Sequence, residues 1–329
     1  MAGWRVVATD PLHAVGEPIL TAANCTLIVP DRGALKAHLA EADALIVRTA
    51  VTADVIAHAP KLRGIVRHGV GLDFIPMEAA CALGIPVANT PGANAQAVAE
   101  HAFAAIFDLA RHLRQADQTL RTSGWHAART ARPDAFELRG KVLGIVGLGN
   151  VGQRIAAIGA HGFGMSVLGT QRNRLNLPSF VQYADLEALF SASDFVVLSC
   201  ALTAETRGMI NSDLIARMKS DALLVNVARG QLIDDEALVA ALAARRIRGA
   251  ALDVFAQQPI AADNAFHTLD NVLLTPHLAS LTADSTERMT RIACEEAVRL
   301  LRGERPLSLA NPQIWPAAQA RFRRLDAAG

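Results

Sequence analysis

Residues 141–160 read KVLGIVGLGNVGQRIAAIGA: an apolar run, the glycine motif Gly147-Leu148-Gly149-Asn150-Val151-Gly152, and then a helical pattern. In a strand–loop–helix unit the first glycine permits a tight turn, the second lets the backbone approach a pyrophosphate, and the third lets helix and strand pack closely. The helix N-terminus then presents N–H groups and a positive dipole end to the phosphates. A chance glycine-rich turn is the alternative, which the flanking strand and helix disfavour. The segment therefore predicts a dinucleotide site at Gly147, Gly149, Asn150, Val151 and Gly152.

Short apolar runs alternate with helical patterns on both sides of this segment. Runs typical of buried strands occur at 5–8, 27–29, 44–47, 64–67 and 86–88, and later at 142–146, 166–169, 195–198, 223–227, 250–254 and 272–275. This alternation predicts parallel sheets covered by helices. We also expect one long helix over 94–122, an exposed connection over 123–134, and a final amphipathic helix over 283–302 that a proline-rich tail follows.

The composition of the 329 residues, 51% hydrophobic and 19% charged, predicts an ordered globular protein with room for two domains. The 32 basic and 31 acidic residues nearly cancel, so we expect no nucleic acid partner and interpret the basic cluster at 321–324 as a solvated tail. No apolar run approaches the roughly 20 residues of a membrane span. The N-terminus lacks a signal-peptide core, and the four cysteines form no CxxC pair. We expect a soluble cytoplasmic protein without a metal site or a membrane partner.

The cofactor is predicted from the end of the second strand of the nucleotide unit. About 20 residues after the glycine motif, where a carboxylate usually binds the adenosine ribose of NAD, the sequence reads Thr170-Gln171-Arg172-Asn173-Arg174. No Asp or Glu occurs between Gly152 and Asp185, whereas two arginines are suited to the 2′-phosphate of NADP. The alternative is that both arginines are ordinary surface residues. We expect NADP or NAD as the cofactor, with NADP favoured, and contacts at Thr170, Gln171, Arg172 and Arg174.

Further motifs occur in order between residues 44 and 311. They are Arg67-His68-Gly69-Val70-Gly71-Leu72-Asp73, Asn89-Thr90-Pro91-Gly92-Ala93-Asn94, Val98-Ala99-Glu100-His101, Met218-Lys219, Asn226-Val227-Ala228-Arg229-Gly230, Leu252-Asp253-Val254-Phe255 and Thr275-Pro276-His277. Together with the glycine motif they resemble the D-isomer-specific 2-hydroxyacid dehydrogenase family, which includes phosphoglycerate dehydrogenase and glyoxylate/hydroxypyruvate reductase.

The resemblance implies an α/β fold of two Rossmann-like, doubly wound parallel-sheet domains with a cleft between them. Residues 1–97 and 287–329 would form the substrate (catalytic) domain, and residues 98–286 the dinucleotide-binding domain. The family also implies a homodimer built through the cofactor domain. Because the sequence ends at Gly329, we expect no added regulatory domain.

The resemblance further implies an NAD(P)-dependent oxidoreductase that reduces a small 2-keto acid to a 2-hydroxy acid. His277 would be the acid/base, because an imidazole can give a proton to the carbonyl oxygen while hydride arrives from the nicotinamide. Arg229 would bind the substrate carboxylate and polarise the carbonyl. The other implied substrate contacts are Arg48, Val70, Gly71 and Asn94, and the other implied cofactor contacts are Val227, Asp253 and Ala279. His68 borders the substrate loop, where it either packs or touches the ligand.

The sequence departs from the family at Gln258, where a glutamate is expected to pair with the histidine. Glutamine can orient the ring of His277 through a hydrogen bond, but it carries no charge, so the pKa of the histidine should be lower than with glutamate. Formate dehydrogenases, on a related scaffold, use such a Gln–His pair. Formate dehydrogenase-like oxidation is therefore one alternative, and a non-catalytic nucleotide-sensing interaction protein is another.

Overall fold

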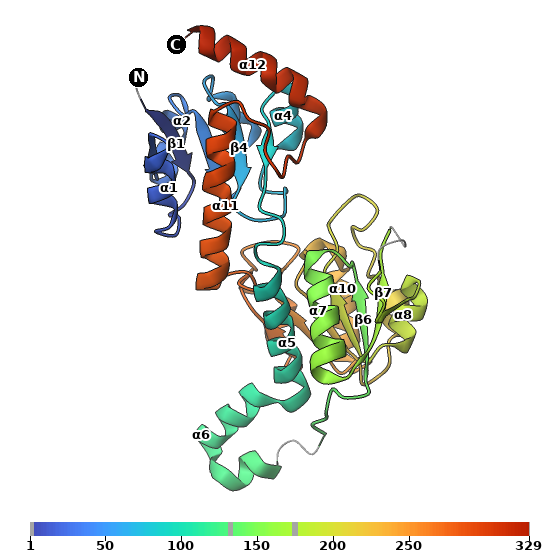
Figure 1. Cartoon of the computed structure of the whole chain (residues 1–329). Helices are drawn as coiled ribbons and strands as arrows, with labels where there is room; N and C mark the ends of the chain where they lie inside the picture. The colour runs from blue at the N-terminus through green and yellow to red at the C-terminus, as the bar shows by residue number, and fades with distance from the viewer. Residues whose placement is uncertain (1–2, 131–133, 173–176, 329) are drawn as a thin grey trace. The chain divides into compact units, whose positions relative to one another are not determined.

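The computed structural model describes residues 3–130, 134–172 and 177–328, which form two compact units (Figure 1). Unit 1 consists of Met1–Asn94 and Thr282–Gly329, and unit 2 consists of Ala95–Leu281. The chain passes between the units directly before helix α5 (Ala95–Arg111) and directly before helix α11 (Ala283–Leu301). The sequence placed these crossings after residues 97 and 286. They fall earlier because α5 packs along its length within unit 2, and α11 within unit 1.

Unit 1 is built on a parallel sheet of five strands in the order β2-β1-β3-β4-β5. The strands are β1 (Trp4–Ala8), β2 (Cys25–Ile28), β3 (Ala44–Val47), β4 (Gly64–Arg67) and β5 (Val87–Ala88), and the helices are α1 (Gly16–Ala22), α2 (Leu35–Leu39), α3 (Ala53–Ala57), α4 (Met77–Ala82), α11 and α12 (Trp315–Ala328). Successive strand residues point to opposite faces, so Val6 packs in a core layer with α1 and α11, and Val7 in a second layer with α2, α3 and α4. Helices therefore cover both faces of the sheet, as its apolar strands require.

Unit 2 is built on a parallel sheet of seven strands in the order β12-β11-β10-β9-β6-β7-β8. The strands are β6 (Val142–Val146), β7 (Ser166–Thr170), β8 (Val181–Tyr183), β9 (Phe195–Leu198), β10 (Leu223–Asn226), β11 (Gly249–Leu252) and β12 (Val272–Leu274), and the helices are α5, α6 (Leu113–Thr130), α7 (Asn150–Ala157), α8 (Leu186–Ala192), α9 (Ser212–Arg217) and α10 (Asp235–Ala243). The chain builds β6 to β8 outward and then returns to the other side of β6 with β9, which is the doubly wound order. The predicted fold class, two doubly wound parallel-sheet α/β domains, is confirmed.

Short polar side chains start several of the helices that cover the sheets. Asp185, Asn211, Asp234 and Thr282 are the N-cap residues of α8, α9, α10 and α11, and the side chain of each accepts a hydrogen bond from a backbone N–H in the first turn. Such a bond satisfies one of the N–H groups that a helix start leaves unpaired, and it is worth about 1 kcal/mol. These caps fix where each strand–helix loop ends, and so they set the position of the loop residues.

The prediction of one continuous helix over 94–122 is wrong, because two helices, α5 and α6, occupy this segment. Helix α5 ends at Arg111, because His112 takes a left-handed conformation with φ of +54°, and α6 begins at the next residue. The helix also continues through the predicted connection as far as Thr130, with a kink at Gly124, whose φ is +82°. None of the residues of α6 is buried, so exposure was predicted correctly and secondary structure was not.

The predicted solvated tail is also wrong, because residues 315–328 form helix α12, which packs on unit 1. Phe322 is buried, with only 4% of its surface exposed. Arg321 donates hydrogen bonds to the carbonyl oxygens of Leu62 and Pro60, each at 2.8 Å. The basic cluster is thus split between one half-buried arginine and two exposed ones. No helix within the described ranges is both long and apolar enough to cross a membrane.

Candidate functional site

The glycine motif forms the turn between β6 and α7. Gly147 has φ of +96°, and a Cβ there would lie 2.6 Å from the backbone of Cys200. A Cβ at Gly152 would lie 2.0 Å from the carbonyl oxygen of Gly147, so neither position accepts a larger residue. At Gly149, by contrast, a Cβ would meet nothing within 4 Å, and α7 begins at the next residue, Asn150. The turn leaves open space in front of the helix N-terminus, and a dinucleotide pyrophosphate fits such a space.

The turn lies where the strand order reverses, between β6 and β9. The Ser199 hydroxyl, just after β9, donates a hydrogen bond to the Gly147 carbonyl at 2.7 Å. The Gly147 N–H donates to the carbonyl of Thr170, the last residue of β7, at 2.9 Å. These bonds tie the carboxyl ends of three neighbouring strands together. In doubly wound sheets this reversal point is where nucleotides bind.

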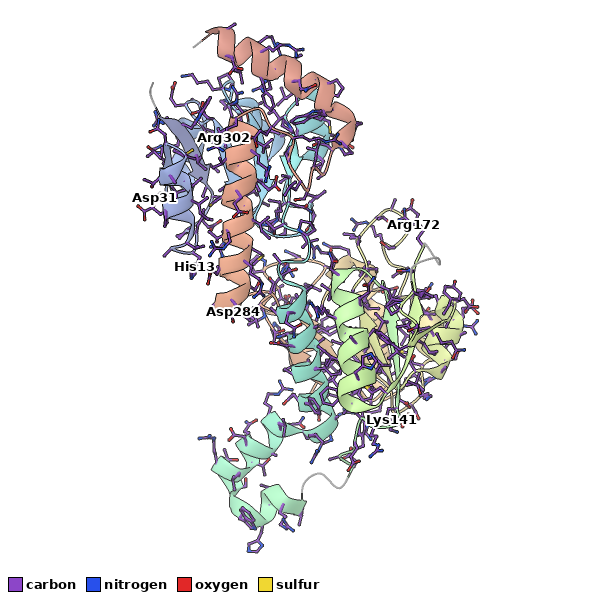
Figure 2. The ribbon with its side chains drawn as sticks, viewed as in Figure 1. His13, Asp31, Lys141, Arg172, Asp284 and Arg302 are labelled. Carbon is purple, nitrogen blue, oxygen red and sulfur yellow. The ribbon has the colours of Figure 1, made fainter. Side chains whose placement is uncertain are left out.

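An acidic residue near Arg172 bears on the choice between NAD and NADP. Arg172 is exposed in the loop after β7 (Figure 2), whereas Arg174 lies outside the described residues. A hydrogen bond from the Thr203 hydroxyl, and to a smaller extent the charge of Arg172, hold the pKa of the exposed Glu205 below its usual range. Glu205 therefore places a carboxylate within electrostatic range of Arg172, although it follows a different strand. The sequence argument missed it because it considered only residues along β7.

The loops after β10, β11 and β12 are joined by close backbone contacts. A Cβ at Gly230 would lie 1.9 Å from the backbone of Phe255, so the first loop presses directly on the second. The His277 N–H donates to the Asp253 carbonyl at 2.8 Å, which joins the third loop to the second. Because β10, β11 and β12 are parallel neighbours, their carboxyl ends meet at one edge of the sheet. The structure therefore brings together the three loops in which sequence placed the catalytic residues.

Arg229 is half-buried in the loop after β10 and is held by Asn226. Asn226 is fully buried at the end of the strand. Its Nδ2 donates to the Arg229 carbonyl at 2.9 Å, and its Oδ1 accepts from the N–H of Ala228 at 3.0 Å. The Arg229 guanidinium donates from Nη1 to the Ala228 carbonyl at 2.6 Å. In the sequence, Asn226 is a polar residue at the end of an apolar strand. That pattern could have identified it, but Asn226 was assigned no role from the sequence.

His277 and Gln258 form the predicted pair. Nδ1 of His277 lies 2.9 Å from Oε1 of Gln258. An amide oxygen only accepts, so Nδ1 carries the proton of this bond. His277 also has φ of +53°, a conformation that costs a residue other than glycine free energy and persists where the surroundings enforce it.

The carboxylate of Asp253 holds the loop of His277 in this conformation. This carboxylate is 2% exposed and accepts three hydrogen bonds from the residues that flank His277. The donors are the Thr275 hydroxyl at 2.7 Å, the Leu278 N–H at 2.9 Å and the Ala279 N–H at 3.0 Å. The N–H of Ala279 is used within the loop, and that of Val227 donates to the Leu198 carbonyl at 3.3 Å.

In unit 1, Arg67 organises the glycine loop at residues 69–71. Its Nε donates to the Gly71 carbonyl at 3.1 Å, its Nη1 donates to the His68 carbonyl at 2.9 Å, and its guanidinium lies 4.2 Å from the ring centre of Phe74. The Val70 carbonyl accepts from the side chain of Asn89, and the Gly69 carbonyl from the N–H of Thr90. All three carbonyls of the loop thus have partners inside the unit, which fixes the direction of its backbone. Arg67 was quoted as part of a motif but was given no function.

The remaining candidates of unit 1 differ in their surroundings. The Oδ1 of Asn94 is buried and accepts no hydrogen bond, which is typical of a polar atom that awaits a ligand or water. The Arg48 side chain donates to the Pro11 carbonyl. His68 is 4% exposed, and its Nε2 lies 2.9 Å from the Thr290 hydroxyl of α11, so it packs in the interior. Burial, more than the charge of nearby Arg48, lowers the pKa of His68 to about 4.

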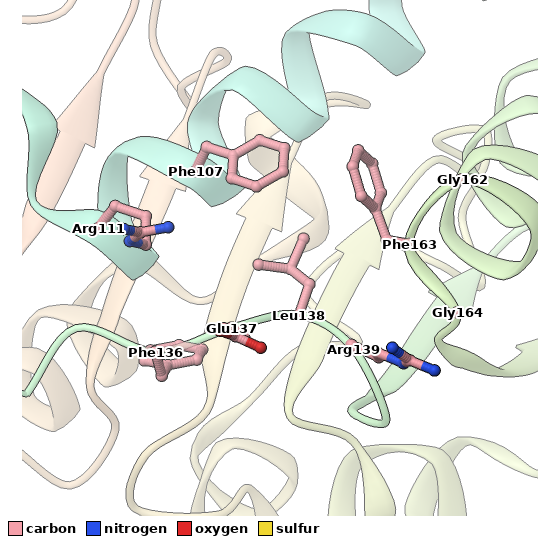
Figure 3. A pocket seen from close by; sticks show the side chains of 9 residues that line it. All are labelled: Phe107, Arg111, Phe136, Glu137, Leu138, Arg139, Gly162, Phe163 and Gly164. Carbon is pink, nitrogen blue, oxygen red and sulfur yellow. The ribbon is translucent and has the colours of Figure 1, made fainter.

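A cavity of about 590 Å³ lies elsewhere in unit 2 (Figure 3). It is lined by Phe107 of α5, by residues 136–139 before β6 and by residues 162–164 before β7. It therefore opens at the amino ends of the strands, whereas the glycine turn lies at their carboxyl ends. Among the described residues no group of three or more His, Cys, Asp or Glu side chains is arranged to hold a metal ion.

Comparisons with known proteins agree with this geometry. Residues 103–279 match the family model described as "D-isomer specific 2-hydroxyacid dehydrogenase, NAD binding domain". Glyoxylate reductase of Pyrococcus furiosus is 39% identical over 283 residues, which cover 83% of this chain and 84% of that protein. The chain belongs to the D-isomer-specific 2-hydroxyacid dehydrogenase family.

Two solved structures resemble the whole chain. TT0316 protein from Thermus thermophilus has a TM-score of 0.86 and 32% identity, covering 93% of this chain and 99% of that one. An acyclic imino acid reductase, Bsp5, described in complex with NADPH and D-Arg, has a TM-score of 0.83, 30% identity and the same coverage. The predicted family is confirmed, and so is the prediction of an enzyme, a D-2-hydroxyacid dehydrogenase that uses NAD or NADP. The roles of individual residues stay predictions.

The buried His68 makes the stability of this dehydrogenase depend on pH. Its pKa is about 4 in the folded protein, against 6.5 for a solvated histidine, so the unfolded chain takes up a proton first as the pH falls. The contribution of His68 to the free energy of unfolding is fully present above pH 6.5 and is lost as the pH falls to 4. The loss is about 3 kcal/mol in total, at about 1.4 kcal/mol per pH unit. Urea unfolding at pH 7, 5.5 and 4.5 should show this loss, and His68→Gln should remove it. The exposed His126→Gln serves as the control, and parallel pH dependences for wild type and His68→Gln would contradict the assignment.

Proposed function

We propose that this dehydrogenase reduces a small 2-keto acid to the 2-hydroxy acid. The bound dihydronicotinamide supplies a hydride to C2 of the substrate. His277 gives the proton on Nε2 to the carbonyl oxygen, so that a C–H and an O–H bond form as the C=O double bond is lost. One observation carries the proposal. The loops that hold Arg229, Gln258 and His277 are joined to one another at the carboxyl edge of the sheet, and the glycine turn lies at the same edge.

Arg229 is the proposed binder of the substrate carboxylate and of the developing alkoxide. A guanidinium matches a carboxylate in a planar, two-point geometry, and its charge stabilises negative charge on the carbonyl oxygen. The half-buried position of Arg229 and the bonds from Asn226 support this role, because they fix the backbone from which the side chain extends. In unit 1, the backbone of Val70 and Gly71 and the unpartnered Oδ1 of Asn94 are the proposed further contacts.

The substrate proposal is tested with glyoxylate, hydroxypyruvate, pyruvate and phenylpyruvate, each with NADH and NADPH. Wild type should reduce at least one acid. His277→Ala and Arg229→Ala should each lower kcat/KM about 100-fold or more, since an acid/base contributes about 10²–10⁴ and a charged clamp a similar factor. Exposed Arg323→Ala is the matched control and should leave the rate unchanged. Wild-type rates in the His277→Ala variant would contradict the assignment.

Gln258 sets the pH range of the reduction in this proposal. The imidazolium must be present to give a proton, and an amide neighbour stabilises it less than a carboxylate would. Gln258→Glu should therefore raise the alkaline limb of the kcat/KM profile by about one pH unit. The profile is measured between pH 5 and 10 with the best acid of the panel. An unmoved limb would mean that Gln258 is not the partner that tunes His277.

Formate oxidation is the second candidate, and the Gln258–His277 bond is the observation that favours it. Formate releases a hydride without a proton to be accepted, so it needs no carboxylate beside the histidine. Reduction of NAD⁺ or NADP⁺ with formate, in the absence of keto acid turnover, would select it. Cofactor binding without turnover on any of these compounds would instead favour a nucleotide-sensing protein.

We propose a modest preference for NADP over NAD. Arg172 supports it, and Glu205 opposes it by placing negative charge near the same guanidinium. Arg172→Ala should therefore lower the ratio of kcat/KM with NADPH to that with NADH by about tenfold, and Glu205→Gln should raise it by a few-fold. Exposed Arg207, in the same loop as Glu205, provides the control Arg207→Ala. A ratio that does not respond to either substitution would exclude this site as the origin of cofactor choice.

We also propose a cytoplasmic homodimer. The described cysteines are all free thiols, which is typical of a reducing compartment. Helix α6 buries none of its residues and exposes Leu113, Leu120 and Trp125, the last at 65%. Several large apolar side chains exposed on one helix are typical of a protein–protein interface.

Light scattering on wild type should give about twice the chain mass of 34.9 kDa. Trp125→Lys should give the monomer, because a charge in a buried apolar interface costs several kcal/mol, while Arg121→Ala on the same helix should remain dimeric. A monomeric wild type, or a Trp125→Lys dimer of unchanged affinity, would contradict an interface at α6.

A further inference from the structure

His101, on helix α5, lies against the loop that carries the proposed acid. Its side chain is 17% exposed, and its Nε2 lies 3.2 Å from the Thr275 hydroxyl oxygen and 3.7 Å from Oδ1 of Asp253. All three residues belong to unit 2. The other helices that cover this sheet follow strands of the same unit, whereas α5 is where the chain enters the unit. His101 therefore connects the entry of the chain to the loop after β12.

The direction of these hydrogen bonds follows from the chemistry of the groups. The Thr275 hydroxyl has one proton and donates it to Asp253 at 2.7 Å, because a carboxylate only accepts. Toward His101 the hydroxyl oxygen can then only accept. Nε2 of His101 must carry a proton, whether the ring is neutral or charged. The order of donation is His101 to Thr275 to Asp253.

His101 also lies within ion-pair distance of the buried carboxylate of Asp253. A carboxylate that is 2% exposed has lost most of its hydration, and a buried charge needs a partner of opposite sign or several donors. Its three hydrogen-bond donors, one hydroxyl and two backbone N–H groups, are neutral. Within the described part of the chain, His101 is the basic side chain within ion-pair distance of Asp253.

We propose that His101 is a positioning residue for the hydride-transfer reaction, which fixes the loop of His277 through Thr275 and Asp253. This rests on the proposed function. His277 has a positive φ and needs a rigid loop to keep its ring in one place. Asp253 accepts hydrogen bonds from residues on both sides of His277. His101 in turn contacts both Thr275 and Asp253. Leu281, after which the chain leaves unit 2, closes the same loop with a hydrogen bond to the Leu278 carbonyl.

Paired substitutions separate the donor from the bulk of the side chain. His101→Gln keeps an N–H near the position of Nε2, and His101→Leu keeps a similar volume without it. His101→Leu should lower kcat about tenfold, because a displaced reacting group loses rate steeply with distance. His101→Gln should stay within about threefold of wild type. The Kd for NADPH should change much less than kcat in both variants, because neither alters the glycine turn that would hold the pyrophosphate.

Thr275 provides an independent pair, which keeps the test valid if His101→Leu does not fold. Thr275→Val removes the hydroxyl at nearly constant shape, and Thr275→Ser restores it. Thr275→Val should resemble His101→Leu, and the double variant should lose no more than the worse single one, because both break the same chain of bonds. Equal losses for Leu and Gln at 101, or fully additive losses in the double variant, would overturn the proposal.

Histidine NMR gives a readout that does not need turnover. With ¹⁵N-labelled histidine, and with His277→Gln to assign its signals, the ring resonances of His277 should shift or broaden in His101→Leu and return in His101→Gln. If they do so while wild type reduces no 2-keto acid, the positioning role stands and the proposed function fails. If wild type is active but the His277 resonances are the same in all variants, the positioning role fails and the function stands.

Discussion

The carboxylate of Asp253 is the interaction on which the candidate site depends. It is buried after β11 and accepts hydrogen bonds from the residues on both sides of His277, while its backbone carbonyl accepts from His277 itself. The histidine is thereby held in a strained conformation that a loose loop would relax. Removing a buried charged group of this kind leaves several donors unsatisfied at once, so the site has no simple substitute for it.

The sheet topology explains why residues far apart in sequence serve one site. In a parallel sheet all carboxyl ends lie at the same edge, so the loops after β10, β11 and β12 are neighbours although Arg229 and His277 are 48 positions apart. The glycine turn after β6 lies at the same edge, at the reversal of strand order. Gly230 brings two of these loops into backbone contact, and only a residue without a side chain permits it.

Most of the fold could be predicted because buried parallel strands read as short apolar runs. The short elements α1 and β8, of seven and three residues, were missed because so few residues show little periodicity. Helix α12 has 14 residues and was missed because its basic stretch also fits a solvated tail. The helix break at His112 could not be predicted, because His112 is neither proline nor glycine, the residues that usually mark such a break. In the candidate site, the sequence predicted residues that belong to motifs, but it gave no role to His101, although His101 ends one of those motifs, and it did not select Glu205. Their partners, Arg172 and Asp253, lie on other elements, so their effect depends on the folded arrangement.

The central claim is that His277 and Arg229 act together on a 2-keto carbonyl beside the nicotinamide. The most direct measurement is transfer of deuterium from cofactor labelled at C4 to C2 of the product, followed by mass spectrometry. Wild type should give a labelled 2-hydroxy acid, and His277→Ala and Arg229→Ala should bind the cofactor normally yet transfer little label. Absence of label in the wild-type product, or full transfer by either variant, would contradict the account.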